Sequence, residues 1–216
     1  MTLRPKLAGS LLLTRMKNDN IEVLMGRRSS AHAFMPKRYV FPGGRVDRVD
    51  HFAPLSGDLE PQCLATMCRH MDARKARAIA VAAVRETAEE TGLIIGEHAD
   101  IPSRHKAWTP FRSVDACPNI SGLSLIARAI TPPGRVRRFD AWFFRADIDQ
   151  VIHTPDDFIA NELEDLRWVD LDTARSLELP HVTHFVLGEL ERLDAKPETK
   201  PRHIRELAKK VRLVTL

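Results

Sequence analysis

Three glutamates are spaced so that one face of a helix would carry all of them. Glu86, Glu89 and Glu90 stand at positions i, i+3 and i+4, which places them within about 100° of arc on a helix. Carboxylates this close repel one another, and a hard divalent cation such as Mg²⁺ or Mn²⁺ would neutralise them. Arg85 lies one turn from Glu89 and can hold a carboxylate through a bidentate pair. The spacing indicates either a metal-binding cluster or a solvated acidic helix face.

The segment that carries these glutamates has the composition of a helix. Residues 74–91 are rich in alanine, and Gly92 follows them in a position that suits a left-handed helix cap. Earlier in the chain, a short strand over 39–41 is stopped by Pro42-Gly43-Gly44. Such a sequence turns the chain sharply and lets the backbone approach a ligand closely. The sequence therefore predicts a helix that bears carboxylates and a tight glycine turn upstream of it.

Strands and helices alternate irregularly along the rest of the chain, and this order predicts an α/β fold with helices packed on a mixed sheet. Polar residues 17–20 between the apolar runs 7–14 and 21–26 predict a hairpin. The remaining expected elements are helices over 61–71, 172–177 and 181–193, strands over 93–95, 123–129, 139–146 and 166–171, a linker over 195–201, and a last helix over 202–212.

The composition is that of an ordinary globular protein of 216 residues with a net charge of +4. Residues 196–212 hold seven Lys and Arg against two Glu, so the basic excess lies in a tail and a nucleic-acid partner is not expected. No apolar run approaches the roughly 20 residues that cross a bilayer. The three cysteines form no paired framework and, with His70, match no ordinary zinc pattern. We expect a cytoplasmic protein with reduced thiols and no membrane partner.

Two motifs together resemble a known family. Arg85-Glu-Thr-Ala-Glu-Glu-Thr-Gly-Leu93 resembles the core of the Nudix box, G-x5-E-x7-R-E-U-x-E-E-x-G-U, and Phe41-Pro-Gly-Gly44 resembles the strand and loop that open it. The resemblance covers roughly residues 7–193. It implies a Nudix-type α/β/α sandwich, with a hydrolase domain over 1–194 and a basic, helical C-terminal tail over 195–216. It also implies a Nudix diphosphatase that acts on a nucleoside diphosphate linked to another group, with Mg²⁺ or Mn²⁺ as cofactor.

This chain departs from the family's box in its spacing. Gly44 and Arg85 are 41 positions apart, where the box has 14, so 27 residues are inserted. Counting back from Arg85 places Arg77 where the box has its first Glu, so that carboxylate is either missing or supplied from inside the insertion. Thr87 stands at the position U after R-E, where the box usually has an aliphatic residue. We expect a helical insertion over about 45–73. This insertion, with 138–144 and 179–183, resembles a branch that includes peroxisomal coenzyme A diphosphatase-like proteins.

Roles follow from the resemblance, residue by residue. Glu86, Glu89 and Glu90, with the carbonyl of Gly43, are the implied metal ligands, and Arg85 orients the carboxylates. The general base is a box Glu or a carboxylate on a later loop, where we favour Glu162 over Glu164. The candidate substrate contacts are Arg27, Arg28, Arg45 and Arg138 for phosphates and Trp108 for a base, although surface arginines and a core tryptophan are the commoner roles.

The resemblance implies a small-molecule diphosphate as substrate, either a coenzyme A-like or a nucleotide-sugar-like compound. Two other functions are alternatives to its hydrolysis. One is a Nudix-fold sensor that binds a nucleotide without cleaving it, and the other is an interaction module built on the insertion and the tail. The three box glutamates favour catalysis. A homodimer through 45–73 is a further hypothesis, and a monomeric mass by light scattering would count against it.

Overall fold

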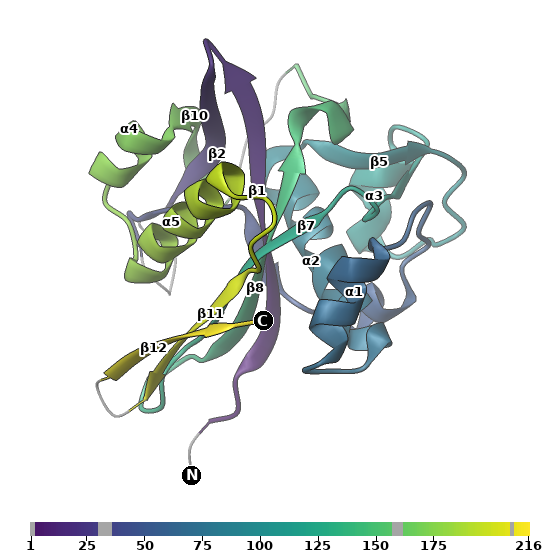
Figure 1. Cartoon of the computed structure of the whole chain (residues 1–216). Helices are drawn as coiled ribbons and strands as arrows, with labels where there is room; N and C mark the ends of the chain where they lie inside the picture. The colour runs from purple at the N-terminus through teal and green to yellow at the C-terminus, as the bar shows by residue number, and fades with distance from the viewer. Residues whose placement is uncertain (1–2, 30–35, 157–161, 208–209) are drawn as a thin grey trace.

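The computed structural model describes residues 3–29, 36–156, 162–207 and 210–216. Its main sheet runs in the order β10-β2-β1-β8-β7-β11-β12, with β3 paired to β2 and β4 paired to β1 (Figure 1). The strands of this sheet are β1 (Lys6–Lys17), β2 (Asn20–Arg28), β3 (Tyr39–Val40), β4 (Gly43–Arg45), β7 (Ser124–Ile130), β8 (Phe139–Asp147), β10 (Leu163–Asp170), β11 (Arg202–Leu207) and β12 (Lys210–Thr215).

The sheet is mixed, as the sequence predicts. β1 and β8 are parallel, as are β7 and β11, whereas β1–β2, β7–β8 and β11–β12 are antiparallel. The β1–β2 hairpin turns at Asn18 and Asp19, which have φ angles of 50° and 62°. Two successive residues of positive φ are typical of the turn that matches the twist of a two-residue hairpin. A smaller sheet joins β5 (Ile94–His98) to β6 (Ala116–Pro118) and β9 (Val151–His153).

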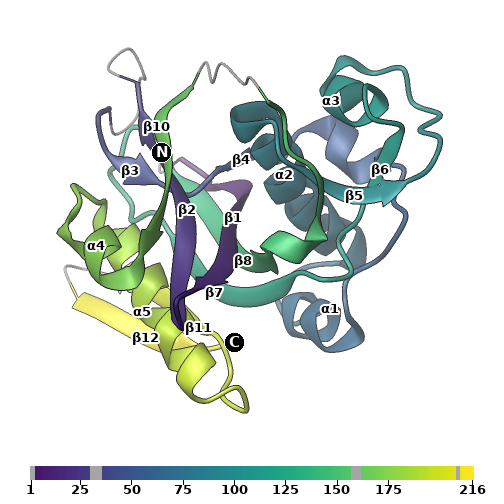
Figure 2. The same ribbon diagram turned by 90° about the horizontal axis from the view of Figure 1, so that it is seen from above.

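Helices cover both faces of the main sheet, which gives three layers (Figure 2). One apolar core lies between the sheet and α1 (Pro61–Cys68), α2 (Ala73–Thr91) and α3 (Thr109–Arg112). A second core lies under α4 (Leu171–Ser176) and α5 (His181–Ala195) on the other face. Three short 3₁₀ turns complete the described elements: η1 (Arg48–Phe52), η2 (Lys106–Trp108) and η3 (Ile148–Gln150). In this part of the chain, no helix has the length and apolar character needed to cross a membrane.

α2 is fixed at both ends and sits directly on β1. Its N-cap, Asp72, accepts a hydrogen bond from the backbone N–H of Lys75, and it ends at Gly92 in the left-handed conformation (φ 73°). At Gly9 of β1 a Cβ atom would lie 2.1 Å from the carbonyl oxygen of Ile79. Only a glycine therefore lets the helix backbone rest on the strand at this point.

The expected helix over 202–212 is wrong. Residues 202–207 and 210–215 form an antiparallel hairpin, and β11 of this hairpin pairs in parallel with β7. Basic residues in this segment suggested a solvated helix, but apolar side chains such as Ile204 and Leu213 recur beside an open sheet edge. Pairing with that edge outweighs the weak local helix propensity. The predicted helices before Gly92 are confirmed as α1 and α2.

Candidate active site

The glycine turn touches the helix that bears the carboxylates. Gly43 and Gly44 are the first two residues of β4 and pair with Ser10 and Gly9 of β1. Gly43 has a φ of 150°, and a Cβ atom there would lie 2.5 Å from the Gly9 carbonyl oxygen. At Gly44 a Cβ atom would lie 2.3 Å from the carboxyl carbon of Glu86. Both positions therefore require glycine, because the turn packs against β1 on one side and against a glutamate of α2 on the other.

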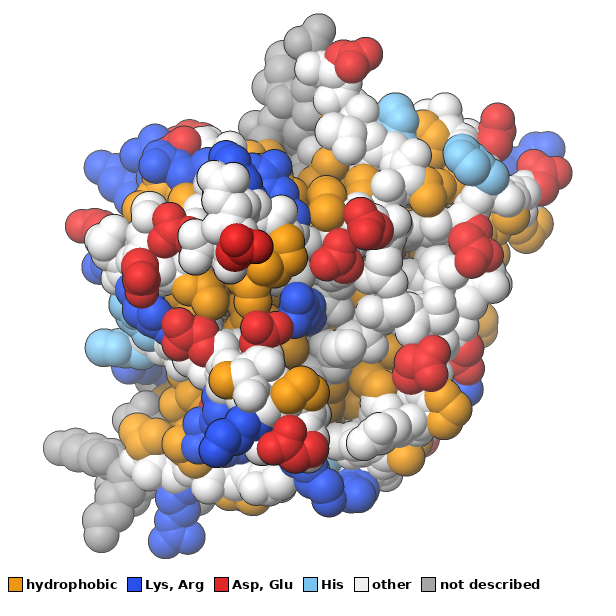
Figure 3. Space-filling model, turned by 45° about the horizontal axis from the view of Figure 1, so that its top comes forward, with side chains coloured by type: hydrophobic (Ala, Val, Ile, Leu, Met, Phe, Trp, Pro, Cys, Tyr) orange, Lys and Arg blue, Asp and Glu red, His pale blue; other side chains and the backbone are white. Residues whose placement is uncertain are grey.

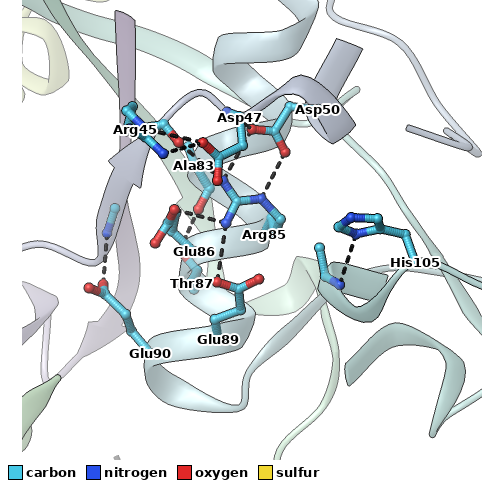
Figure 4. A network of polar contacts seen from close by, with 12 residues as sticks. Arg45, Asp47, Asp50, Ala83, Arg85, Glu86, Thr87, Glu89, Glu90 and His105 are labelled. Atoms are coloured by element: carbon cyan, nitrogen blue, oxygen red, sulfur yellow. Dashed lines mark hydrogen bonds and ion pairs between the residues drawn. The ribbon is translucent and has the colours of Figure 1, made fainter. Parts of the chain in front are cut away.

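Each of the three box glutamates has a defined partner (Figure 4). The backbone N–H of Gly43 donates to Oε2 of Glu90 at 2.9 Å. Nη1 of Arg85 donates to Oε1 of Glu86 at 2.8 Å and to Oε2 of Glu89 at 3.1 Å. The structure thus brings the three side chains to one end of α2, where Glu86 and Glu89 contact Arg85 and Glu90 contacts the glycine turn. Arg85 thus contacts two of the carboxylates that the resemblance expects it to orient, and that role stays a prediction.

A fourth carboxylate, Asp50 of η1, holds Arg85 from the other side (Figure 4). Nε and Nη2 of Arg85 donate to its two oxygens at 2.7 and 3.1 Å, and the side chains are 3% and 0% exposed. Asp50 stands six positions after Gly44, the spacing of the first Glu in the box. Sequence reasoning missed it by counting back from Arg85 across the insertion; counting forward from Gly44 finds it. The carboxylate is therefore supplied from inside the segment 45–73, and the extra residues lie after it.

Burial sets the charge state of this cluster. Burial raises the pKa of Glu90 to about 8, with the hydrogen bond from Gly43 acting against the rise. It raises the pKa of Glu86 to about 7, and the nearby Arg85 opposes this. The pKa of Glu89 is also raised, mainly by burial. Burial alone would lower the pKa of Arg85, but its hydrogen bond to Asp50 and the surrounding carboxylates outweigh this and raise it.

Arg28 of β2 and Glu162 complete the charged surroundings of Glu90. Burial lowers the pKa of Arg28, and the charges of Glu90, Glu162 and Glu86 act in the opposite direction. The charge of Glu162 also contributes to the raised pKa of Glu90. The backbone N–H of Ser29 donates to the Glu162 carbonyl oxygen at 3.2 Å, which fixes this residue beside the end of β2. The structure therefore brings Arg28 and Glu162 to the box glutamates.

The donor set fits a hard divalent cation. Carboxylates whose pKa is raised by burial are under-compensated in charge, and carboxylate and carbonyl oxygens are the ligands that Mg²⁺ and Mn²⁺ prefer. In the described residues no three His, Cys, Asp or Glu side chains are already arranged around one point as a cage. One oxygen of Glu86 and one of Glu89 face Arg85, so the other oxygen of each is the one that Arg85 leaves for an ion.

The other predicted substrate contacts have different outcomes. Arg45 pairs with Asp47 at 2.7 Å, and its carbonyl oxygen accepts from Arg85. Arg27 lies 3.6 Å from Glu164, and its buried Nε has no partner among the described residues. Arg138 donates instead to the carbonyl oxygens of Thr131 and Leu3, and no contact in the described structure joins it to the carboxylates.

The candidate role of Trp108 in stacking on a base is wrong. Its side chain is fully buried in the core on the α2 side of the sheet, where its ring lies 5.8 Å from that of Phe111 in an edge-on arrangement. A ring without exposed surface cannot stack on a ligand. The commoner role of a large aromatic residue, core packing, applies here.

A cluster of three polar side chains, Tyr39, Asp165 and Arg167, was also not predicted from the sequence; we call it the brace. The Tyr39 hydroxyl donates to Asp165, and Arg167 contacts both residues. Asp165 has a φ of 53°, at the point where the pairing of β10 with β2 shifts register. The brace ties β3, which precedes the glycine turn, to β10, which follows Glu162. A tyrosine and an aspartate more than a hundred positions apart give no signal of this contact in one sequence.

The fold and the acidic cluster are those that the sequence resemblance predicts, and a family comparison agrees. The model of the NUDIX domain matches residues 4–186, so the chain belongs to the NUDIX domain family. It is accordingly a hydrolase that acts on diphosphate linkages. No curated protein matches the sequence, and the comparisons do not confirm the coenzyme A diphosphatase-like branch.

Solved structures share this fold at low sequence identity. A NUDIX hydrolase from Alicyclobacillus acidocaldarius is 23% identical with a TM-score of 0.63, over 86% of this chain and 90% of that one. The NUDIX domain of Shewanella oneidensis NrtR, complexed with ADP ribose, is 14% identical with a TM-score of 0.51, over 88% and 90%. A MutT protein from Methanosarcina mazei Go1 is 16% identical with a TM-score of 0.50, over 91% and 98%. At these identities the likeness shows the fold alone.

Proposed function

We propose that this protein hydrolyses, with Mg²⁺ or Mn²⁺, the diphosphate of a nucleoside diphosphate linked to another group, in a coenzyme A-like or nucleotide-sugar-like compound. The observation that carries the proposal is Glu90: it is 5% exposed, its pKa is raised to about 8, and it is held against the Gly43 turn by a backbone hydrogen bond. A buried carboxylate at a glycine turn, with Glu86 and Glu89 beside it, is suited to bind a cation and little else.

The residues that would hold the metal are Glu86, Glu89 and Glu90, with the carbonyl of Gly43. When bound, the ion supplies neutralisation of phosphate charge and a more acidic bound water. Arg85 holds one oxygen of Glu86 and one of Glu89, and the Gly43 N–H holds one Glu90 oxygen. Preorganised carboxylates of this kind need no rearrangement when charge develops on the phosphate.

Glu162 is our candidate for the general base. It lies within electrostatic reach of Glu90 and Arg28, whereas Glu164 lies 3.6 Å from Arg27 and is half exposed. Replacing a general base lowers kcat by about 10²- to 10⁴-fold. We therefore expect such a loss in Glu162→Gln and a change of a few fold at most in Glu164→Gln, its matched control. Nearly wild-type activity in Glu162→Gln would assign the proton transfer to a box glutamate.

A small molecule suits this protein better than a nucleic acid. On the face shown in Figure 3, basic side chains gather at the upper left, and elsewhere acidic and apolar side chains separate them, so no basic tract extends across this face. Nucleic-acid affinity depends on such a tract. The proposed substrate therefore engages the protein through its diphosphate and the groups near it.

The test is a substrate panel assayed with Mg²⁺ and with Mn²⁺: coenzyme A, ADP-ribose, dinucleoside polyphosphates and NADH. Wild-type protein should cleave at least one member, Glu90→Ala should cleave none, and Glu198→Ala, which removes an exposed glutamate of the tail, should behave as wild type. Circular dichroism establishes that the Glu90 variant is folded. If the wild type binds ADP-ribose but cleaves no member with either metal, the protein is a sensor and the proposal fails.

A further inference from the structure

A surface hollow lies between η1 and the N-terminal end of α2. Its volume is about 430 Å³, and it is lined by Arg48, His51 and Phe52 of η1 and by Asp72, Arg74 and Lys75 at the start of α2. Arg74 precedes Arg85 by eleven residues on the same helix, which is about 16 Å along its axis. The hollow is therefore a separate feature of the surface and no part of the carboxylate cluster.

Positive charge in this hollow is not compensated. Three basic side chains line it, those of Arg48, Arg74 and Lys75, and the single carboxylate among the lining residues is Asp72. Asp72 already accepts hydrogen bonds from the backbone N–H and the Nζ of Lys75, at 2.9 and 2.7 Å. Across the described residues, no hydrogen bond or ion pair engages the side chain of Arg48 or that of Arg74, although the Arg74 guanidinium lies over the ring of Phe52. Two guanidinium groups that line one hollow without an anionic partner provide donors of the geometry that phosphate accepts.

An exposed aromatic ring lies in the same hollow. The side chain of Phe52 is 64% exposed. The guanidinium carbon of Arg74 lies 4.5 Å from the centre of its ring. This contact stacks the arginine on one part of the phenyl group and orders both side chains. A ring that is exposed, ordered and bordered by cations is a platform on which a nucleobase can stack.

From these observations we propose that the hollow binds a phosphorylated nucleoside. Arg48, Arg74 and Lys75 bind the phosphate, and the ring of Phe52 stacks on the base. The ligand is either the nucleoside end of an extended diphosphate substrate or a free nucleotide. The two sources share one chemistry, and binding itself does not rest on the function proposed above. η1 also carries Asp50, which holds Arg85, so one short turn connects this site to the catalytic helix.

The binding test uses adenosine 3′,5′-bisphosphate, which contains no diphosphate bond and is not a substrate for the proposed reaction. Calorimetric titration without metal compares wild type with the double variant Arg48→Gln/Arg74→Gln. The control is Arg135→Gln/Arg137→Gln, which removes two charges from exposed arginines on the β7–β8 connection. We expect affinity to fall at least tenfold in the first double variant and to stay within twofold of wild type in the second. Equal affinity in the two double variants, or no binding by the wild type, overturns the proposal.

The role of the ring is tested separately from that of the charges. Phe52→Ala keeps every cation but removes the ring on which Arg74 rests, so its affinity for inorganic phosphate should fall only slightly. Its affinity for the bisphosphate should fall by a clearly larger factor, because the stacking contact with the base is also lost. A bisphosphate affinity unchanged in Phe52→Ala would refute base stacking at this site.

Kinetics with a substrate from the panel distinguish the two sources. If the hollow takes the nucleoside end of the substrate, Arg48→Gln/Arg74→Gln raises KM at least tenfold with kcat retained, and the bisphosphate inhibits competitively. If it takes a free nucleotide, KM is unchanged and the bisphosphate acts without competing with substrate. Either result supports the site. If the substrate panel shows no turnover, the titrations still decide whether the hollow binds a nucleotide, so the two proposals fail independently.

Discussion

Replacing Asp50 with Asn should destabilise the protein far more than its small change in shape suggests. The Asp50–Arg85 pair is almost completely buried, and both hydrogen bonds of its fork are well formed at 2.7 and 3.1 Å. Removing one partner of such a pair leaves a buried charge without full compensation, which costs about 3–5 kcal/mol. Glu86 and Glu89 still contact Arg85, so we place the loss near the lower limit, at about 3 kcal/mol.

The matched control is Asp58→Asn. Asp58 binds Arg77 through the same bidentate arrangement, at 2.7 to 2.9 Å, but the two side chains are 48% and 36% exposed. An exposed pair contributes about 0–1 kcal/mol. Urea unfolding of both variants and the wild type gives the two free-energy changes directly. If Asp50→Asn loses no more stability than Asp58→Asn, burial is not what makes the Arg85 pair important, and our explanation of the site's architecture is wrong.

Two further predictions concern the glycine turn and the C-terminal hairpin. Gly44→Ala places a Cβ atom 2.3 Å from the carboxyl carbon of Glu86, so kcat on a cleaved substrate should fall at least tenfold; Gly188→Ala, where a Cβ atom meets nothing within 4 Å in α5, should keep full activity. Burial, helped by the charge of Arg128, lowers the pKa of His203 to about 4, so its neutral form is favoured in the folded state. The contribution of neutral His203 to the free energy of unfolding is complete above pH 6.5 and is lost as the pH falls toward 4. In urea titrations over this range, the free energy of unfolding of the wild type should therefore fall by up to about 3 kcal/mol more than that of His203→Gln. Parallel pH profiles for the two proteins would contradict the assignment to His203.

Local signals in the sequence predict most of the fold. Alanine-rich composition and the Gly92 stop predict α2, and Asn-Asp between two apolar runs predicts the first hairpin. The C-terminal segment is different, because its conformation depends on the free edge of β7. A strand that forms by pairing with a distant partner carries only weak local preference, so the charges of residues 202–212 were misleading.

In the candidate site, too, the residues predicted from local sequence differ from those that only the fold brings together. Residues joined by helical spacing, Arg85 and Glu86 through Glu90, are found from the sequence because one turn of helix brings them together. Asp50 and the Tyr39–Asp165 brace come from distant segments and require the fold to meet. The burial of a side chain cannot be predicted from its residue type either. Trp108 is fully buried and therefore cannot contact a substrate. Arg28, by contrast, lies close enough to Glu90 for their charges to interact.

The glycine on β1 at which α2 rests has a consequence for how this protein can evolve. Because backbone meets backbone at Gly9, the height of the acidic helix above the strand is set by main-chain dimensions and does not depend on which side chains fill the interior. Drift in the two apolar cores can therefore alter stability while the distance between turn and glutamates stays the same. The opposite holds at this one position, where even a methyl group would lift the helix and spoil the chemistry. The position of the helix thus depends on glycine at position 9, just as the turn depends on glycine at positions 43 and 44.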